Sequence, residues 1–117
     1  MNPKKEMKNW ADHIPHPLTI CNDKGVILYM NPKSIESFKK TEVLDLVGSN
    51  LIDCHPEPSK SQLREMLNNK TGQTYTIEKR GQKTLIHQFP WFEADDYMGF
   101  MELSIKLPVE LRNIKRD

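Results

Sequence analysis

The pattern of apolar and polar positions along the chain predicts a domain of short strands and short helices. Runs of apolar, β-branched and aromatic residues bounded by Gly, Pro, Asn or Asp predict five strands. These strands cover residues 18–22, 26–30, 74–79, 83–92 and 97–107. Short connections between the later strands favour antiparallel pairing. We therefore expect an α+β domain in which short helices pack on one face of a five-stranded antiparallel sheet.

The junction between residues 26–30 and the following helix carries the clearest local signal. Residues 26–30 are all apolar or aromatic, which is typical of a strand buried on both faces, so we expect this strand in the middle of the sheet. Asn31 can accept hydrogen bonds from the free amides of a helix, and Pro32 suits the first helical position. The strand is therefore expected to end where a helix begins.

Three further stretches have the features of helices. Residues 3–12 carry apolar residues three and four positions apart, which predicts an amphipathic helix. Thr41 can cap a short helix over residues 42–47, which Gly48 would end. Ser59 begins a sequence with the spacing of a capping box, and an apolar stripe follows it. We expect this last helix to be the main helix and to lie across the sheet.

Composition excludes several classes of protein. The chain has 117 residues, enough for one domain with its own core, and a formal net charge of +1. The balanced charge provides no basic field for nucleic acid, and no apolar run approaches the roughly 20 residues that span a membrane. The two cysteines follow no signal peptide, which is typical of the reducing cytoplasm. We therefore expect a cytoplasmic protein that contacts neither nucleic acid nor membrane.

The order of these motifs resembles that of a PAS domain. Asp23-Lys24-Gly25, the apolar strand and Asn31-Pro32 are similar to the opening phrase of that family, and Gly48 with the residues after it is similar to the phrase that follows. The resemblance implies a bacterial PAS domain over 14–107, an amphipathic flanking helix over 1–13 and a C-terminal tail over 108–117. The position of the apolar strand in the middle of the sheet is part of this expectation.

The PAS family uses the hollow between its helices and its sheet to hold haem, flavin, small acids or nothing. Strand alternation and helical spacing predict the residues at this hollow. They are Tyr29, Leu51, Cys54, His55, Met66, His87, Phe89 and Met101. A plainly packed core without a ligand is the alternative, because apolar stripes usually serve packing.

The orientation of His87 depends on the register of its strand. If Leu85, His87 and Phe89 share the inward face, an imidazole projects among apolar side chains and can bind a polar group of a ligand. The opposite register turns Ile86 and Gln88 inward and exposes His87. We expect the inward orientation of His87.

The segment Cys54-His55-Pro56-Glu57-Pro58-Ser59 resembles a stretch found in bacterial PAS proteins, some of them joined to hemerythrin-like domains. His55 or Cys54 could ligate a haem iron, since imidazole and thiolate are common donors. Alternatively, Cys54 is a small buried side chain and His55 fixes the loop by a hydrogen bond. Haem-sensing PAS proteins carry the ligand His on the main helix, where residues 59–69 have none.

Other cofactor chemistry finds less support in the sequence. The light-sensing flavin relatives carry a reactive Cys at the position of Leu51, so we expect no photoactive flavin adduct. His13 and His16 lack the further ligands of a metal site. The adjacent residues Cys54 and His55 cannot face each other as a nucleophile and its base, and we therefore expect no enzymatic activity.

The resemblance implies a stand-alone sensory or adaptor domain that binds a small ligand in its internal pocket. Such a domain would signal through a homodimer or through contacts with a signalling protein, because Pro108 discourages a helix that leads to an output domain. The alternatives are a haem-binding redox or gas sensor and a ligand-free protein-interaction module. The apolar residues expected at the interface are Met7, Trp10, Met98 and Phe100.

Overall fold

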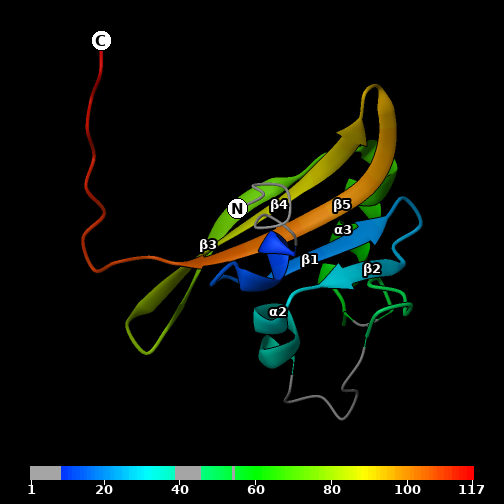
Figure 1. The fold of residues 1–117 in the computed structure, drawn as a ribbon, viewed down its shortest axis with the longest axis horizontal. Coiled ribbons are helices and arrows are strands. Elements are labelled where there is room, and N and C mark those ends of the chain that lie inside the picture. Colours follow the sequence, from blue (N-terminus) through cyan, green and yellow to red (C-terminus); the bar gives the residue numbers. More distant parts are fainter. Residues whose placement is uncertain (1–8, 39–45, 54) are drawn as a thin grey trace, which may run out of the picture.

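The structure, a computed structural model, describes residues 9–38, 46–53 and 55–117 and contains all five predicted strands (Figure 1). Its elements are the 3₁₀ helix η1 (Trp10–His13), β1 (Leu18–Asn22), β2 (Ile27–Met30), α2 (Pro32–Ser37), α3 (Ser59–Asn69), β3 (Gln73–Lys79), β4 (Gln82–Glu93) and β5 (Asp96–Lys106). None of the strand ends differs from the predicted one by more than one residue. No described helix combines the length and the apolar character needed to span a membrane.

The five strands form one antiparallel sheet in the order β2-β1-β5-β4-β3. The helix α3 lies across one face of this sheet, and η1 lies at the other face (Figure 1). We call the face toward α3 the inner face and the opposite one the outer face. The predicted α+β arrangement of an antiparallel sheet with helices on one face is confirmed.

The prediction that residues 26–30 form a central strand is wrong, because β2 is an edge strand. Its side chains are not buried on both faces: Ile27 is buried, whereas Leu28 is 50% exposed. The free edge of β2 is covered by a loop instead of a strand, since the Ile27 amide donates to the Ser49 carbonyl at 2.9 Å and the Ile27 carbonyl accepts from the Gly48 amide at 2.8 Å. This covering explains why an edge strand can be as apolar as a central one.

The helix α2 begins as predicted, at Pro32 behind the cap Asn31. The Asn31 side chain is fully buried, and its Oδ1 accepts from the Ser34 amide at 2.9 Å and from the Leu18 amide at 3.0 Å. Its Nδ2 donates to the His16 carbonyl at 2.8 Å. One side chain therefore joins the start of β1, the end of β2 and the first turn of α2.

The predicted capping box does not form at α3. Ser59 is the first helical residue, and Pro58 before it offers no side-chain cap. The Glu57 carboxylate accepts from the Ser61 amide at 2.9 Å and also from the Ser61 hydroxyl. Glu57 therefore satisfies one of the free amides in the first turn of α3, and its negative charge suits the N-terminal end of a helix.

The remaining helix predictions fall partly outside the described residues. Of the predicted helix over 3–12, the structure describes only the end, where Trp10–His13 form the 3₁₀ helix η1. Thr41 and most of the expected helix over 42–47 lie outside the described residues. Gly48 has a φ of 92°, the left-handed conformation expected for a residue that ends a helical segment.

The core fills the space between the inner face of the sheet and α3. Its buried residues are Cys21, Ile27, Met30, Leu46, Leu51, Leu63, Met66, Leu67 and Phe100. The expectation that Phe100 contributes to an interface is therefore wrong, since Phe100 is only 1% exposed. Because side chains alternate along a strand, Glu102 faces inward like Phe100, whereas Met101 and Leu103 face outward.

Replacing Asn31 by Ala should destabilise the fold by about 3 kcal/mol, because it leaves two backbone amides and a carbonyl without their partner in a buried place. Urea unfolding followed by circular dichroism measures this change. The matched control is Asn68→Ala on the exposed side of α3, which we expect to stay within about 0.5 kcal/mol of the parent. Equal stability of the two variants would contradict the role given to Asn31.

Candidate functional site: a small pocket between α3 and the sheet

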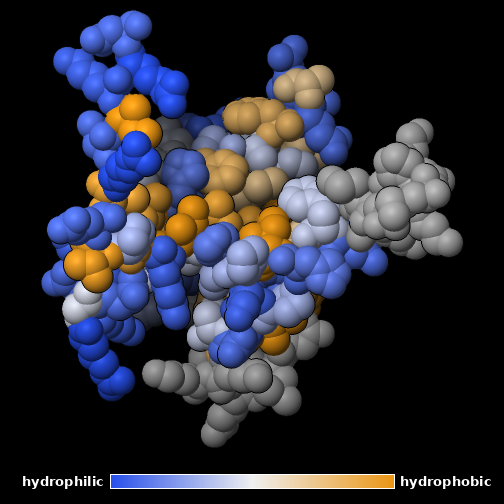
Figure 2. All heavy atoms as spheres, turned by 60° about the vertical axis from the view of Figure 1, so that its left-hand side comes forward, coloured by the Kyte–Doolittle hydropathy of each residue, from blue (hydrophilic) through white to orange (hydrophobic). Residues whose placement is uncertain are grey.

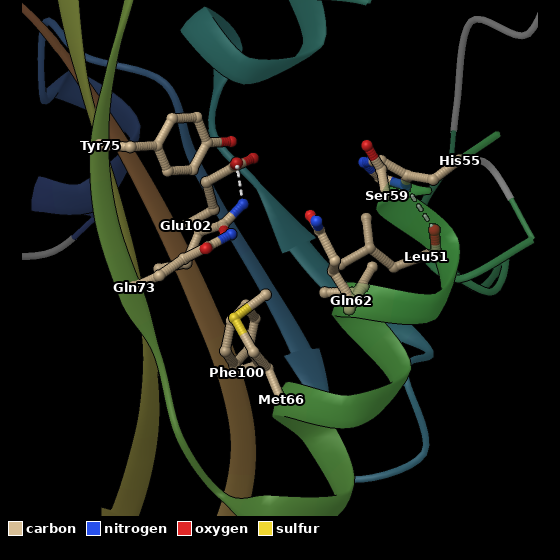
Figure 3. Close-up of a pocket in the computed structure, with 11 residues that line it drawn as sticks. Leu51, His55, Ser59, Gln62, Met66, Gln73, Tyr75, Phe100 and Glu102 are labelled. Atoms are coloured by element: carbon tan, nitrogen blue, oxygen red, sulfur yellow. Dashed lines mark hydrogen bonds between the residues drawn. The ribbon is translucent and has the colours of Figure 1, made fainter. Parts of the chain in front are cut away.

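A pocket of about 80 Å³ lies between α3, the loop before it and the inner face of β3, β4 and β5 (Figure 3). It is lined by Leu51, His55, Ser59, Gln62, Leu63, Met66, Gln73, Tyr75, Gln88, Phe100 and Glu102. A single water needs on the order of 10–15 Å³ measured in this way, so the pocket has room for roughly five to eight waters or for a very small organic molecule.

The pocket has an apolar floor and a polar wall. Leu63 and Met66 from α3 and Phe100 from β5 are buried and form the floor. Tyr75 from β3 and Glu102 from β5 project from the sheet side toward the space in front of α3 (Figure 3). An occupant would therefore meet hydrocarbon on one side and hydrogen-bonding groups on the other, the usual division of a ligand site.

Three polar side chains of the wall form a row across the sheet. Gln73 on β3 pairs with Gln88 on β4, which pairs with Glu102 on β5. The Gln73 Nε2 donates to the Gln88 Oε1 at 2.8 Å, and the Gln88 Nε2 donates to the Glu102 Oε1 at 2.8 Å. Since an ionised carboxylate only accepts hydrogen bonds, Glu102 determines which way the Gln88 amide points, and Gln88 in turn determines the direction of the Gln73 amide.

Tyr75 responds to the same carboxylate. Burial raises the pKa of the Tyr75 phenol, the negative charge of Glu102 raises it further, and the Gln88 side chain acts in the lowering direction. The phenol is therefore neutral at physiological pH and keeps its O–H as a donor.

His55 is held by its own loop. Its Nδ1 lies 2.7 Å from the Leu51 carbonyl oxygen. Because a carbonyl only accepts, Nδ1 carries the proton of this bond, and Nε2 of a neutral His55 keeps its lone pair. The contact agrees with the alternative in which His55 fixes the loop.

The structure brings together three of the predicted pocket residues. Leu51, His55 and Met66 line the pocket. Cys54 lies outside the described residues.

Four other predicted pocket residues lie elsewhere. Tyr29, His87, Phe89 and Met101 do not line the pocket and belong to the outer face. His87 is exposed, bonds the Thr74 Oγ1 at 2.7 Å and stacks on Phe89 with 4.7 Å between ring centroids. The Tyr29 hydroxyl donates to Asp12 of η1. The expected inward direction of His87, Phe89 and Met101 is wrong because β4 and β5 turn the opposite face inward, with Ile86 and Phe100 buried. Tyr29 lies on β2, where Ile27 and Met30 are the buried side chains.

The polar wall was missed by sequence reasoning. Gln73, Tyr75, Gln88 and Glu102 carry no motif, and sequence reasoning did not consider them as site residues. A signal did exist in β5, where Phe100 and Glu102 share one face. Phe100, as a large apolar residue, indicates that this face turns toward the core, so the Glu102 carboxylate is expected beside the core.

The residues expected at the interface do not form one exposed surface. Trp10 is 59% exposed, Met98 is half-buried and Phe100 belongs to the core. Met7 lies outside the described residues. The outer face of the sheet instead carries a set of half-buried apolar side chains that the prediction assigned to the inside.

The pocket does not fit a haem. Cofactor-sized pockets have volumes of roughly 300–1,000 Å³, several times the volume found here. Within 9–38, 46–53 and 55–117, no three His, Cys, Asp or Glu side chains gather as a group that could hold a metal ion.

No family model matches this sequence, and no curated protein matches it. The PAS domain of BvgS from Bordetella pertussis is 14% identical with a TM-score of 0.65, and the match covers 92% of this chain and 88% of that one. The Aer2 receptor from Vibrio cholerae, described as a dual PAS-heme oxygen sensor, is 16% identical with a TM-score of 0.55, covering 84% of this chain and 99% of that one.

A third similar structure is the sensor region of a sensor histidine kinase, at 18% identity and a TM-score of 0.57. The match covers 77% of this chain but only 38% of that region. Likeness at this level of identity concerns the fold, and it shows that this chain has the PAS fold.

Replacing Glu102 by Gln should lower the pKa of Tyr75, because it removes the nearby negative charge that disfavours the phenolate. Absorbance titration near 295 nm measures this pKa in a Tyr29→Phe, Tyr97→Phe background, where Tyr75 is the only tyrosine left. Glu65→Gln on the exposed side of α3 is the control and should leave the titration unchanged. An unchanged titration in Glu102→Gln would place Tyr75 outside the field of that carboxylate.

Proposed function

We propose that this PAS-fold domain is a sensory domain that binds a small molecule in the pocket between α3 and the sheet and signals through contacts of the outer face. The observation that supports the pocket is its polar wall beside an apolar floor, with a carboxylate, a phenol and two amides on the inner face of three neighbouring strands. Gln88 and Glu102 are half-buried beside the core, where side chains that serve packing alone are mostly apolar.

The second part of the proposal concerns transmission to the surface. An occupant of the pocket contacts α3 on one side and β3, β4 and β5 on the other. A ligand shifts a conformational equilibrium only by the difference in its affinity for the two states. An occupant that bonds to Glu102 or Gln88 therefore favours those arrangements of β4 and β5 in which these side chains reach it.

The outer face supports a role in protein contacts. It carries half-buried apolar side chains on the strands that bear the polar wall, and Figure 2 shows hydrophobic residues reaching the surface among hydrophilic ones on the side that it presents. The outer-face set comprises Leu85, Phe89, Trp91, Met101, Leu103 and Ile105. We infer a second copy of the chain, or another signalling protein, as the partner that covers this set.

A ligand-free interaction module is the second candidate, and the small volume of the pocket favours it. Native mass spectrometry of the purified protein distinguishes the two functions. A bound small molecule that is lost in Gln62→Phe, where a ring occupies the mouth of the pocket, supports the sensory function. Protein that binds no small molecule under any growth condition, and still forms a complex, supports the interaction module.

Replacing Met101 by Glu should weaken self-association, because it places a charge among the apolar side chains of the outer face. Size-exclusion chromatography with light scattering, at a concentration where the parent is a dimer, should show the monomer mass for this variant. The matched control is Thr76→Glu at the exposed edge of the same face, which should leave the mass unchanged. Identical masses for the parent and Met101→Glu would assign self-association to another surface.

A further inference from the structure

We infer that the pocket selects a small organic cation, a primary ammonium compound of about four to six non-hydrogen atoms. The inference rests on the proposed function, because it names the class of ligand for the same pocket. It follows from the charge of the lining, from the direction of its hydrogen bonds and from its size.

The charge of the lining has one sign. Glu102 is the single carboxylate among the lining residues, and neither Lys nor Arg occurs among them in the described part of the chain. The nearby titratable groups are His55, across the pocket from the sheet, and the neutral phenol of Tyr75. A carboxylate or phosphate ligand would thus meet Glu102 without a fixed cation to pair with, whereas an ammonium group would be paired.

The hydrogen bonds of the polar row leave an acceptor for such a cation. Gln88 donates to Oε1 of Glu102, and among residues 9–38, 46–53 and 55–117 no hydrogen bond reaches the second carboxylate oxygen, which can accept from a ligand donor. Gln88 donates to Glu102 and Gln73 donates to Gln88, so the side-chain oxygen of Gln73 is a further acceptor. An ammonium group brings three donors and no acceptor, which matches these two acceptors, while the Tyr75 O–H remains a donor for another group of the ligand.

The opposite wall suits a short polar tail on the same molecule. His55 lines the α3 side of the pocket, and its Nδ1 is already bonded to Leu51, so its Nε2 can accept from a hydroxyl group. Between the two walls lie Met66 and Phe100, which offer hydrocarbon contact for one or two methylene groups. The volume of about 80 Å³ excludes ligands much larger than this.

Three molecules of nearly equal size test the inference: ethanolamine is the cation, ethylene glycol is the neutral analogue and glycolate is the anionic analogue. Isothermal titration calorimetry measures their binding, and amide resonances of Gln73 and Gln88 in nuclear magnetic resonance spectra locate it. We expect ethanolamine to bind at least about tenfold more tightly than either of the others, a difference of about 1.4 kcal/mol. We also expect it to shift the side-chain amide resonances of both glutamines.

Variants test the role of the carboxylate. Glu102→Gln keeps the size of the side chain and should reduce ethanolamine affinity at least about tenfold, whereas Glu65→Gln on the exposed side of α3 should leave it unchanged. Thermal unfolding verifies that each variant is folded. Glu102→Asp keeps the charge, and we expect it to weaken binding while keeping the preference for the cation.

The outcomes separate this inference from the proposed function. Tighter binding of glycolate, or undiminished binding of ethanolamine to folded Glu102→Gln, would overturn the cation selectivity while leaving a ligand pocket in place. Failure of ethanolamine to bind the parent protein would also overturn the inference. The proposed function itself is decided separately, by the small molecule that native mass spectrometry finds or does not find in the purified protein.

Discussion

The structure depends most on the hydrogen bonds of one fully buried side chain, Asn31. It joins the carbonyl of His16 and the amide of Leu18, at the start of β1, to the amide of Ser34 in the first turn of α2. These bonds hold the start of β1 against the end of β2 and set the position of α2. Since β1 lies between β2 and β5, this junction holds β2 and α2 to the strand that connects them with the rest of the sheet. Leaving such groups unpaired inside the fold would be costly, which makes the arrangement specific.

The fold could be predicted to the extent that its signals are local. Asn31 before Pro32 indicated the start of α2, and each strand was recognised from its own residues. The position of β2 in the sheet could not be predicted this way. Its apolar character is explained by residues 48 and 49, which cover its free edge and which no local pattern connects to it. The PAS fold is nevertheless present, because order and pairing, not the burial of β2, define it.

The candidate site was predicted for the helix and the loop but not for the sheet. Leu51, His55 and Met66 do line the pocket that the structure contains, and for Met66 the apolar stripe of α3 leaves only one side to face the sheet. A strand, in contrast, can turn either of its two faces toward the core. If the wrong face is chosen, every side chain of the strand is assigned to the wrong side of the sheet. His87 was therefore expected in the pocket and lies on the outer face, whereas Gln88 next to it forms part of the polar wall.

The same alternation gives a physical basis for coupling the pocket to the surface. Glu102 in the polar wall lies between Met101 and Leu103 of the outer face, so one stretch of backbone carries both the ligand contact and the apolar contact. A cation bonded to the second oxygen of Glu102 would add a partner to the carboxylate that holds β5 to Gln88 of β4 on the inner face. Under the proposed function, a ligand would change how the outer face meets a partner only if it bonded differently in two arrangements of these strands, because a molecule that fills the space equally in both shifts no equilibrium.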